Sequence, residues 1–140
     1  MRSRKRARSA FTLIEILVVV VILAVLAAVV VPNVINRIGD AKVSAAVSDI
    51  KTFETDIELF HLDTGAMPPN LDALITNPGA AKWNGPYLKN QDKVPMDPWG
   101  HPYAYKAPGD NGREYDIVSA GPDGQAGTPD DIQSWNIKKQ

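Results

Sequence analysis

The sequence of 140 residues contains no cysteine. Disulfide bonds and thiolate metal sites are therefore excluded. A chain of this length has room for one small domain and one long element, but not for two full domains. If the domain lies in an oxidising compartment, some other device must take the place of disulfides in stabilising it.

Basic side chains are scarce outside the first ten residues. Those ten residues carry five of the fifteen Lys and Arg side chains and no acidic one. The rest of the chain holds ten basic and sixteen acidic side chains, so it is acidic. Binding to phosphates needs Lys and Arg clustered on the folded part, so this balance argues against nucleic acid as a partner.

The usual patterns of catalytic sites are also missing. The sequence has no cysteine nucleophile, no Ser-His-Asp spacing, no glycine-rich phosphate loop and no HExxH pattern. His61 and His101 are isolated in the sequence, and surface or packing roles fit them best. We therefore predict that the chain is not an enzyme.

A long apolar run dominates the amino-terminal part. Every residue from Ile16 to Val31 is apolar, and extending the run back to Phe11 gives 21 residues with one charge, Glu15. About 20 apolar residues suffice for a helix to cross a bilayer. The basic residues before the run place that end in the cytoplasm and the rest of the chain outside.

Three interpretations of this run remain open from composition alone. A secretory signal peptide fits, with the small residues Ala27 and Ala28 as a cleavage site, although the run is long for one. A plain single-pass anchor also fits, with Glu15 reaching back to the interface. A functional role for Glu15 is the third, since a charge inside an apolar segment usually marks function.

The residues around the start of the run resemble a known processing site. The basic leader, Ser9-Ala10 and then the sequence FTLIE from Phe11 to Glu15 are similar to type IV pilins and type II secretion pseudopilins. The resemblance implies that a prepilin peptidase removes residues 1–10, cuts between Ala10 and Phe11, and methylates the new amino group. The family nearly always has glycine before the cut, so we expect Ala10 to permit cleavage at a lower rate.

In that family a glutamate lies at the position of Glu15. After cleavage, the amine of Phe11 and the carboxylate of Glu15 are both costly in apolar surroundings unless they are paired. We expect the amine of a neighbouring subunit to pair with this carboxylate and so to set the register of assembly.

The helical pattern continues beyond the apolar run and ends near Asp63-Thr64-Gly65. Pro32 should kink or loosen this helix, and Gly39 is a second weak point. An apolar stripe recurs at steps of three and four residues and predicts the face that packs on the rest of the domain; it comprises Val43, Ala46, Ile50, Phe53, Ile57 and Phe60. Asp49, Thr52 and Asp56 are predicted on the other side of the helix.

The remainder of the chain predicts a small head of turns and short strands. Asn70 should cap a short helix over residues 71–75. Aromatic residues in the loops that follow, Trp83, Tyr87 and Trp99, are expected to anchor those loops on the core. Strands are predicted at residues 103–106, 114–119 and 132–137, with a hairpin turn at residues 109–112. The predicted fold class is α+β: a long amino-terminal helix packed on a small antiparallel sheet.

Residues 120–131 form a loop rich in Gly, Pro and Asp between the last two predicted strands. Asp123, Asp130 and Asp131 suggest a hard cation bound by oxygen ligands, above all calcium, although the spacing is not that of an EF-hand. Asp and Gly also populate turns for backbone reasons, and taken alone the residues favour an ordinary turn.

The head as a whole resembles the major pseudopilins of type II secretion. The similar segments are Asp97–Gly100, Tyr115–Gly124, Asp130–Ile132 and Trp135. The resemblance implies a pilin-like fold with a calcium ion in the last loop. By position, the side chains of Asp123 and Asp130 would bind it, with Asp131 as a further candidate. The backbone carbonyls of Ala120, Gln125 and Thr128 would complete the shell.

The resemblance further implies a subunit that polymerises into a periplasmic fibre and supports export of folded proteins across the outer membrane. It predicts a leader at 1–10, an inner-membrane and assembly helix at 11–32, and a periplasmic head at 33–140. Partners would be copies of the chain, minor pseudopilins, the inner-membrane secretion platform, the prepilin peptidase and membrane lipid. Two alternatives are the major pilin of a type IV pilus and a membrane-tethered calcium-binding domain that does not assemble. The absence of a carboxy-terminal cysteine pair counts against the type IV pilin.

Overall fold

The computed structural model describes residues 11–137, with the side chains of that range except those of residues 31–36. The predicted leader, including Ala10, lies outside the described residues. The helices and strands follow in the order α1 (Leu13–Thr64), η1 (Leu71–Leu74), β1 (Ala104–Lys106), η2 (Asp110–Gly112), β2 (Asp116–Ser119) and β3 (Ile132–Gln133). The chain divides into two compact units, one ending at Gly39 and the other covering Asp40–Gln140.

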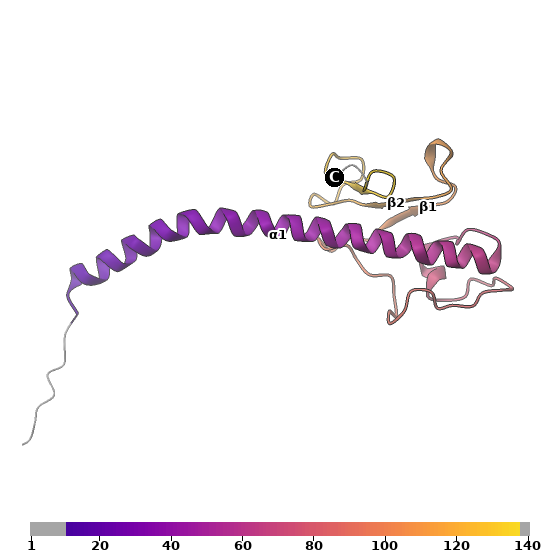
Figure 1. Ribbon diagram of the computed structural model, residues 1–140, viewed down its shortest axis with the longest axis horizontal. Helices are drawn as coiled ribbons and strands as arrows, with labels where there is room; N and C mark the ends of the chain where they lie inside the picture. The colour runs from indigo at the N-terminus through magenta and orange to yellow at the C-terminus, as the bar shows by residue number, and fades with distance from the viewer. Residues whose placement is uncertain (1–10, 138–140) are drawn as a thin grey trace, which may run out of the picture. The chain divides into compact units, whose positions relative to one another are not determined.

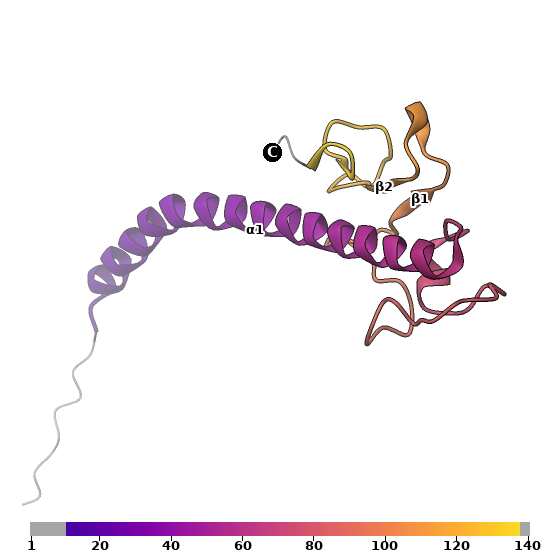
Figure 2. The same cartoon turned by 45° about the vertical axis from the view of Figure 1, so that its right-hand side comes forward.

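The first unit consists of the apolar half of α1 (Figure 2). The segment Leu13–Val30 is long and apolar enough to cross a membrane, with a mean hydropathy of 3.3, and none of it is buried within the chain. The backbone is helical through Pro32 and Gly39, so neither residue ends α1. The kink predicted at Pro32 stays a prediction, because its side chain lies outside the described residues.

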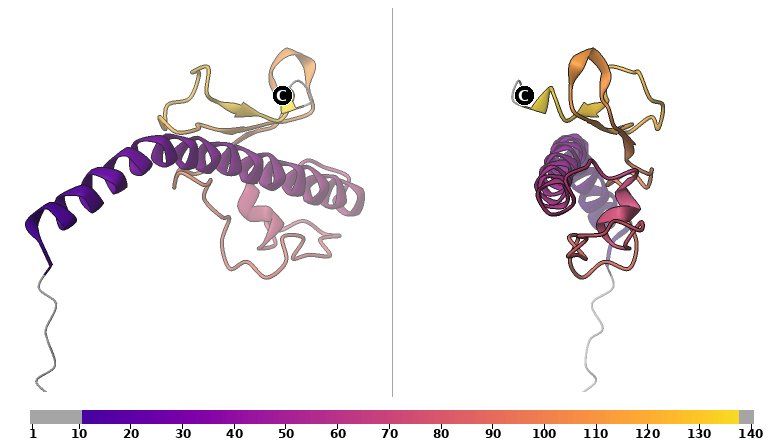
Figure 3. Two further views of the ribbon diagram at one scale, coloured as in Figure 1. Left: turned by 60° about the vertical axis from the view of Figure 1, so that its left-hand side comes forward. Right: turned by 90° about the vertical axis from the view of Figure 1, so that its right-hand side faces the viewer.

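The second unit is built around the carboxy-terminal half of α1. In Figure 1 the strands β1 and β2 lie along one side of this half, and the segment around η1 lies along another; the end-on view in Figure 3 separates the two. Strand order is β1-β2-β3 with antiparallel pairing throughout. The predicted α+β fold with a small antiparallel sheet is thus confirmed.

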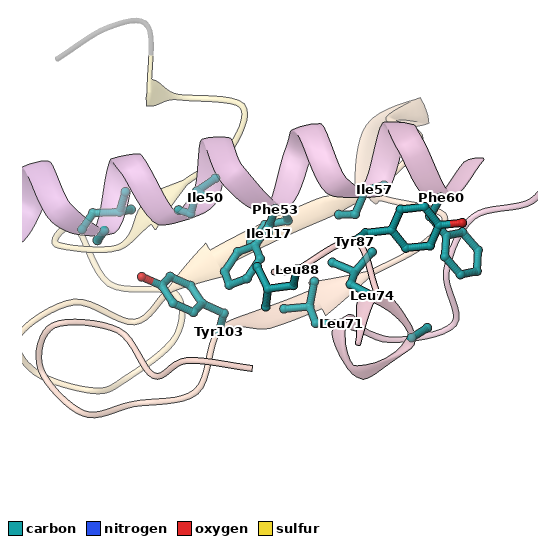
Figure 4. Close-up of a cluster of buried hydrophobic side chains, with 13 residues drawn as sticks. Ile50, Phe53, Ile57, Phe60, Leu71, Leu74, Tyr87, Leu88, Tyr103 and Ile117 are labelled. Carbon is teal, nitrogen blue, oxygen red and sulfur yellow. The ribbon is translucent and has the colours of Figure 1, made fainter. Parts of the chain in front are cut away.

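The apolar stripe of α1 forms the centre of the core (Figure 4). From Ala46 to Phe60 its residues are at most 2% exposed, and Val43 packs at the edge. Residues from the sheet, from η1 and from the following loop close over it: Leu71, Ala73, Leu74, Tyr87, Leu88, Tyr103, Ile117 and Ile132. Because all these residues lie between positions 46 and 132, the head has a core of its own.

The end of α1, the cap of η1 and the anchoring of the Trp83 loop agree with the predictions. The helix α1 ends at Thr64, and Gly65 adopts a left-handed backbone with φ of 77°. The Asn70 side chain accepts a hydrogen bond from the amide of Ala73 at 3.0 Å and so caps η1. Trp83 donates its indole N–H to the carbonyl of Ala73, which anchors its loop as predicted.

The strands are shorter than predicted. The third strand stops at Gln133 instead of continuing to residue 137, because Ser134 leaves the ladder. Its amide donates to the Ile117 carbonyl, while its hydroxyl accepts from the Ile117 amide. The chain then turns, and Trp135 lies 4.0 Å from the Arg113 guanidinium in a cation–π contact.

One prediction about α1 is wrong. Asp56 was expected on the polar side of the helix, yet its side chain is buried, with 8% of the residue exposed. The apolar stripe is wider than the steps of three and four residues indicate, because Tyr87 and Leu88 fold over this side of the helix as well.

Candidate functional site

The acidic loop, residues 120–131, joins β2 to β3 and is held at both ends by their pairing. Ser119 is opposite Ile132 in the register. Inside the loop the chain folds back on itself so closely that Gly121 cannot carry a side chain. Its φ is 62°, and a Cβ there would lie 2.5 Å from the carbonyl oxygen of Asp130. The loop is thus compact, and Asp130 lies against Gly121 near the start of the loop.

Oxygen atoms converge on the hydroxyl of Thr128 at the centre of the loop. Its Oγ1 lies 2.6 Å from Asp130 Oδ1, 3.0 Å from the Gln125 carbonyl oxygen and 3.4 Å from Asp123 Oδ1. Asp131 Oδ1 lies 3.5 Å away. A hydroxyl has one proton, so it can donate to only one of these acceptors at a time. The structure therefore brings together all three predicted carboxylates around one point.

Backbone amides also donate hydrogen bonds to two of these carboxylates. The amide of Gln125 donates to Asp123 at 2.8 Å, and that of Gly127 donates to Asp131 at 2.7 Å. The hydrogen bond from Thr128 is the main reason why the pKa of Asp130 lies below its usual value. The charged form of Asp130 is thus favoured.

The donor chemistry of the loop fits a hard cation such as calcium, which takes six to eight oxygen ligands. The side chains are not arranged as a finished cage. In residues 11–137, no three carboxylates, histidines or cysteines are close enough to form one. Carboxylate, hydroxyl and carbonyl oxygens converge instead as a hydrogen-bonded loop. The sequence predicted Thr128 through its carbonyl, whereas its side chain holds the central position.

The sequence did not predict the structural role of Asp97, a buried carboxylate at the base of the acidic loop. Asp97 is 3% exposed and accepts hydrogen bonds from the Ser119 hydroxyl at 2.6 Å, from the His101 amide at 2.8 Å and from the Trp99 amide at 3.1 Å. Burial alone would raise the pKa of Asp97, but these hydrogen bonds outweigh burial and lower it. Ser119 in turn accepts from the amide of Gly121, which ties the acidic loop to this carboxylate.

Ser119, Asp97 and His101 are the residue types of a hydrolase triad, but their connections differ from one. The serine hydroxyl donates to the aspartate and is fully buried. The imidazole of His101 makes no hydrogen bond to this group, since its Nδ1 lies 3.7 Å from Asp97 Oδ1. A triad needs a hydrogen bond from the serine to the histidine. This cluster is a structural clamp under the loop.

The start of α1 shows how the second predicted site is built. The side chain and carbonyl oxygen of Thr12 both accept from the amide of Glu15, at 3.3 and 3.1 Å, so Thr12 caps the helix. Glu15 lies in the first turn, where the helix dipole favours a negative charge. Phe11 is 74% exposed. Phe11 thus lies just before the start of α1 and Glu15 in its first turn, four residues further along the chain.

Two families match the chain, and together they cover nearly all of it. The family described as type II secretion system (T2SS), protein G matches residues 33–135. A prokaryotic N-terminal methylation motif matches residues 5–31, which contain Phe11 and Glu15.

The curated relatives agree with the first family. The type II secretion system core protein G of Aeromonas hydrophila is 44% identical over 143 residues, which covers 96% of this chain and 97% of the relative. The protein of the same name from Pseudomonas aeruginosa is 46% identical over 144 residues, covering 95% and 99%.

A solved structure shows the same fold. The crystal structure of the major pseudopilin from the type 2 secretion system of enterohaemorrhagic Escherichia coli matches with a TM-score of 0.60 and 32% identity, covering 76% of this chain and 97% of that one. The resemblance seen in the sequence is confirmed, and the pseudopilin interpretation is preferred to the two alternatives. The chain belongs to the type II secretion system protein G family, and it is a pseudopilin, a structural subunit of the pseudopilus.

Proposed function

We propose that this pseudopilin is cut before Phe11, anchored in the inner membrane by its apolar helix, and then polymerised into a periplasmic pseudopilus that supports export of folded proteins across the outer membrane. The observation that carries the proposal is the helix Leu13–Val30, which is apolar except for Glu15 in its first turn and is unburied within the chain. A helix of that kind is stable only in lipid or among other helices. Lipid would cover this apolar surface before assembly, and the helices of neighbouring copies would cover it in the fibre.

In this proposal Glu15 sets the register of the bundle. The carboxylate is exposed at the first turn of α1 and has no charged partner among the described residues. The new amine of Phe11 in a neighbouring copy would neutralise it in surroundings from which water is excluded. Minor pseudopilins and the inner-membrane platform would meet the same helices, and the chain would have no catalytic part in secretion.

The test replaces Glu15 by Leu, Val or Ala in the full chain. Each variant should insert and lose its leader, because neither step needs the carboxylate, but the yield of fibres should fall strongly. Glu15→Asp, which keeps the charge, should retain part of the yield. Immunoblotting of the membrane fraction reports cleavage, and shearing followed by electron microscopy reports fibres. Normal fibre yield from Glu15→Leu would contradict the role of Glu15.

We further propose that the acidic loop binds calcium. Asp123 and Asp130 would supply side-chain oxygens, Asp131 a third, and the carbonyls of Ala120, Gln125 and Thr128 further ones. The support is the convergence of their oxygens on the Thr128 hydroxyl. Bound calcium would neutralise these charges and cross-link the loop, which cannot be cross-linked by a disulfide. Its binding free energy would add to that of folding.

A thermal melt of the head fragment, residues 35–140, tests this. The fragment contains the whole core of the head. At a calcium concentration about 100 times the dissociation constant, the head should gain about 2.7 kcal/mol of stability over the same sample with chelator. Asp130→Asn should abolish the gain. The matched control is Asp92→Asn, which removes an exposed carboxylate outside the loop and should leave the gain intact. No calcium effect on the wild-type fragment would contradict the site.

A further inference from the structure

Three aspartates recur at steps of seven residues along one face of α1: Asp49, Asp56 and Asp63. The outer two each accept a hydrogen bond from a tyrosine of the loops packed on the helix. The Tyr103 hydroxyl donates to Asp49 at 2.8 Å, and the Tyr87 hydroxyl donates to Asp63 at 2.9 Å. The middle one has no such donor. Asp56 is more than nine-tenths buried, and its Oδ2 has no hydrogen-bond partner among the described residues.

An unpartnered buried carboxylate oxygen is costly, because it has lost its water without gaining a donor. Burial is the main cause that raises the pKa of Asp56, and the distant ammonium of Lys89 only partly offsets it. Lys89 does not come within ion-pair distance of Asp56. The head alone therefore leaves this group unsatisfied, whereas it satisfies the two neighbouring aspartates.

Asp56 lines a groove of about 410 Å³ between α1 and the segment around residues 87–95. The walls combine apolar side chains, among them Leu59 and Leu88, with the carboxylates of Asp49 and Asp56. Lys89 of the same chain also lines the groove but forms no ion pair with either carboxylate. Leu59 remains 45% exposed and Leu62 77% exposed on the same half of the helix. A groove with apolar walls and a carboxylate that lacks a donor matches a side chain with an aliphatic stem and a cationic end, such as that of lysine.

The chain itself carries lysines of the required kind. Lys106 pairs with Asp110, and Lys42 lies over the ring of Trp99. Lys51, Lys82 and Lys93 are exposed, and their ammonium groups have no hydrogen bond or ion pair with any described residue. Polymerisation brings many copies of the head side by side, so these lysines and the groove are presented to each other at high effective concentration.

We propose that the groove at Asp56 is a contact surface of the pseudopilus, in which the carboxylate of Asp56 pairs with a lysine of a neighbouring copy of this chain. The inference rests on the proposed polymerisation and adds to it a contact between heads, separate from the pairing at Glu15. The groove is completed only when a second copy inserts its lysine. Asp56 would then stabilise the assembled fibre while it lowers the stability of the isolated head.

This trade-off gives a test with two measurements on each variant. In the head fragment, Asp56→Asn and Asp56→Leu should leave the melting temperature unchanged or raise it, because they remove an unsatisfied charge. In the full chain produced with the secretion platform, the same variants should lower the fibre yield about tenfold or more, as expected when a charged contact repeated at each interface is lost. Asp92→Asn is the matched control and should change neither quantity.

Charge exchange identifies the occupant. Asp56→Lys should abolish fibres, and combining it with Lys51→Asp, Lys82→Asp or Lys93→Asp should restore them in one of the three pairs. If Asp56→Asn forms fibres like the wild type, or if it destabilises the head fragment, the proposal is overturned. Loss of fibres with rescue by none of the pairs would show another protein in the groove and overturn the pairing between copies. If the wild-type chain itself forms no fibre, the proposed polymerisation fails, and this contact fails with it.

Discussion

Replacing Asp97 by Ala should be among the most damaging single changes in the head. Asp97 is 3% exposed and is the common acceptor of three hydrogen bonds, from Ser119, His101 and Trp99. Hydrogen bonds to a charged group contribute roughly 1.5–3 kcal/mol each, and their loss is not additive. Because three donors would be left buried without an acceptor, we expect a loss of about 3–5 kcal/mol.

Such a loss is a large fraction of the stability of a small domain, which is about 5–15 kcal/mol. The melting temperature of the head fragment should fall by about 12 °C or more. Urea unfolding of the fragment, followed by tryptophan fluorescence, measures the free energy directly. Asp97→Asn is the control: it retains one carbonyl oxygen and the shape of the side chain, and should cost only about 1–2 kcal/mol.

The effect of this substitution should depend on pH. The pKa of Asp97 in the folded head lies below its ordinary value of 3.8, so the charged form is favoured by folding. The contribution is therefore fully present above the unfolded pKa of about 3.9 and is lost as the pH falls through the folded pKa. The difference between wild type and Asp97→Ala should be constant near neutral pH and shrink below pH 3.8. A difference under about 1 kcal/mol at pH 7 would refute the reasoning.

Two further predictions concern the core and the acidic loop. Phe53 is 1% exposed and packs edge-on against Tyr103 with 5.1 Å between ring centroids, so Phe53→Ala should cost about 3–5 kcal/mol in urea unfolding of the head; Phe53→Leu should cost less, and equal losses would contradict cavity formation as the cause. Gly121→Ala should displace Asp130, because its Cβ would lie 2.5 Å from the Asp130 carbonyl oxygen at a φ of 62°. Calcium titration calorimetry on the head fragment should then show weaker binding than for the control Gly127→Ala, whose Cβ would meet no atom within 4 Å although its φ is also positive, at 93°; equal affinities would contradict the role of this close approach.

Features set by neighbouring residues could be predicted from the sequence. The end of α1 at Thr64 followed from Gly65, and the cap of η1 followed from Asn70. The spacing of apolar residues identified the stripe that forms the centre of the core. Each of these depends on contacts within one or two turns of helix, and the residue types alone report them.

Features set by distant residues could not be predicted in this way. The hydrogen bond between Tyr103 and Asp49 joins residues 54 positions apart, and the one between Ser119 and Asp97 joins residues 22 positions apart. Periodicity placed Asp56 on the solvent side, because it cannot show that a later loop covers that side. The central place of the Thr128 hydroxyl likewise depends on how the acidic loop folds back.

The central claim is that the chain is cut before Phe11 and polymerises in that form. Mass spectrometry of the chain isolated from sheared fibres tests this most directly. The account predicts a mature chain that begins at Phe11 and carries one methyl group on its amine. A chain that still begins at Met1, or one cut after Ala27 or Ala28 as by a signal peptidase, would contradict it.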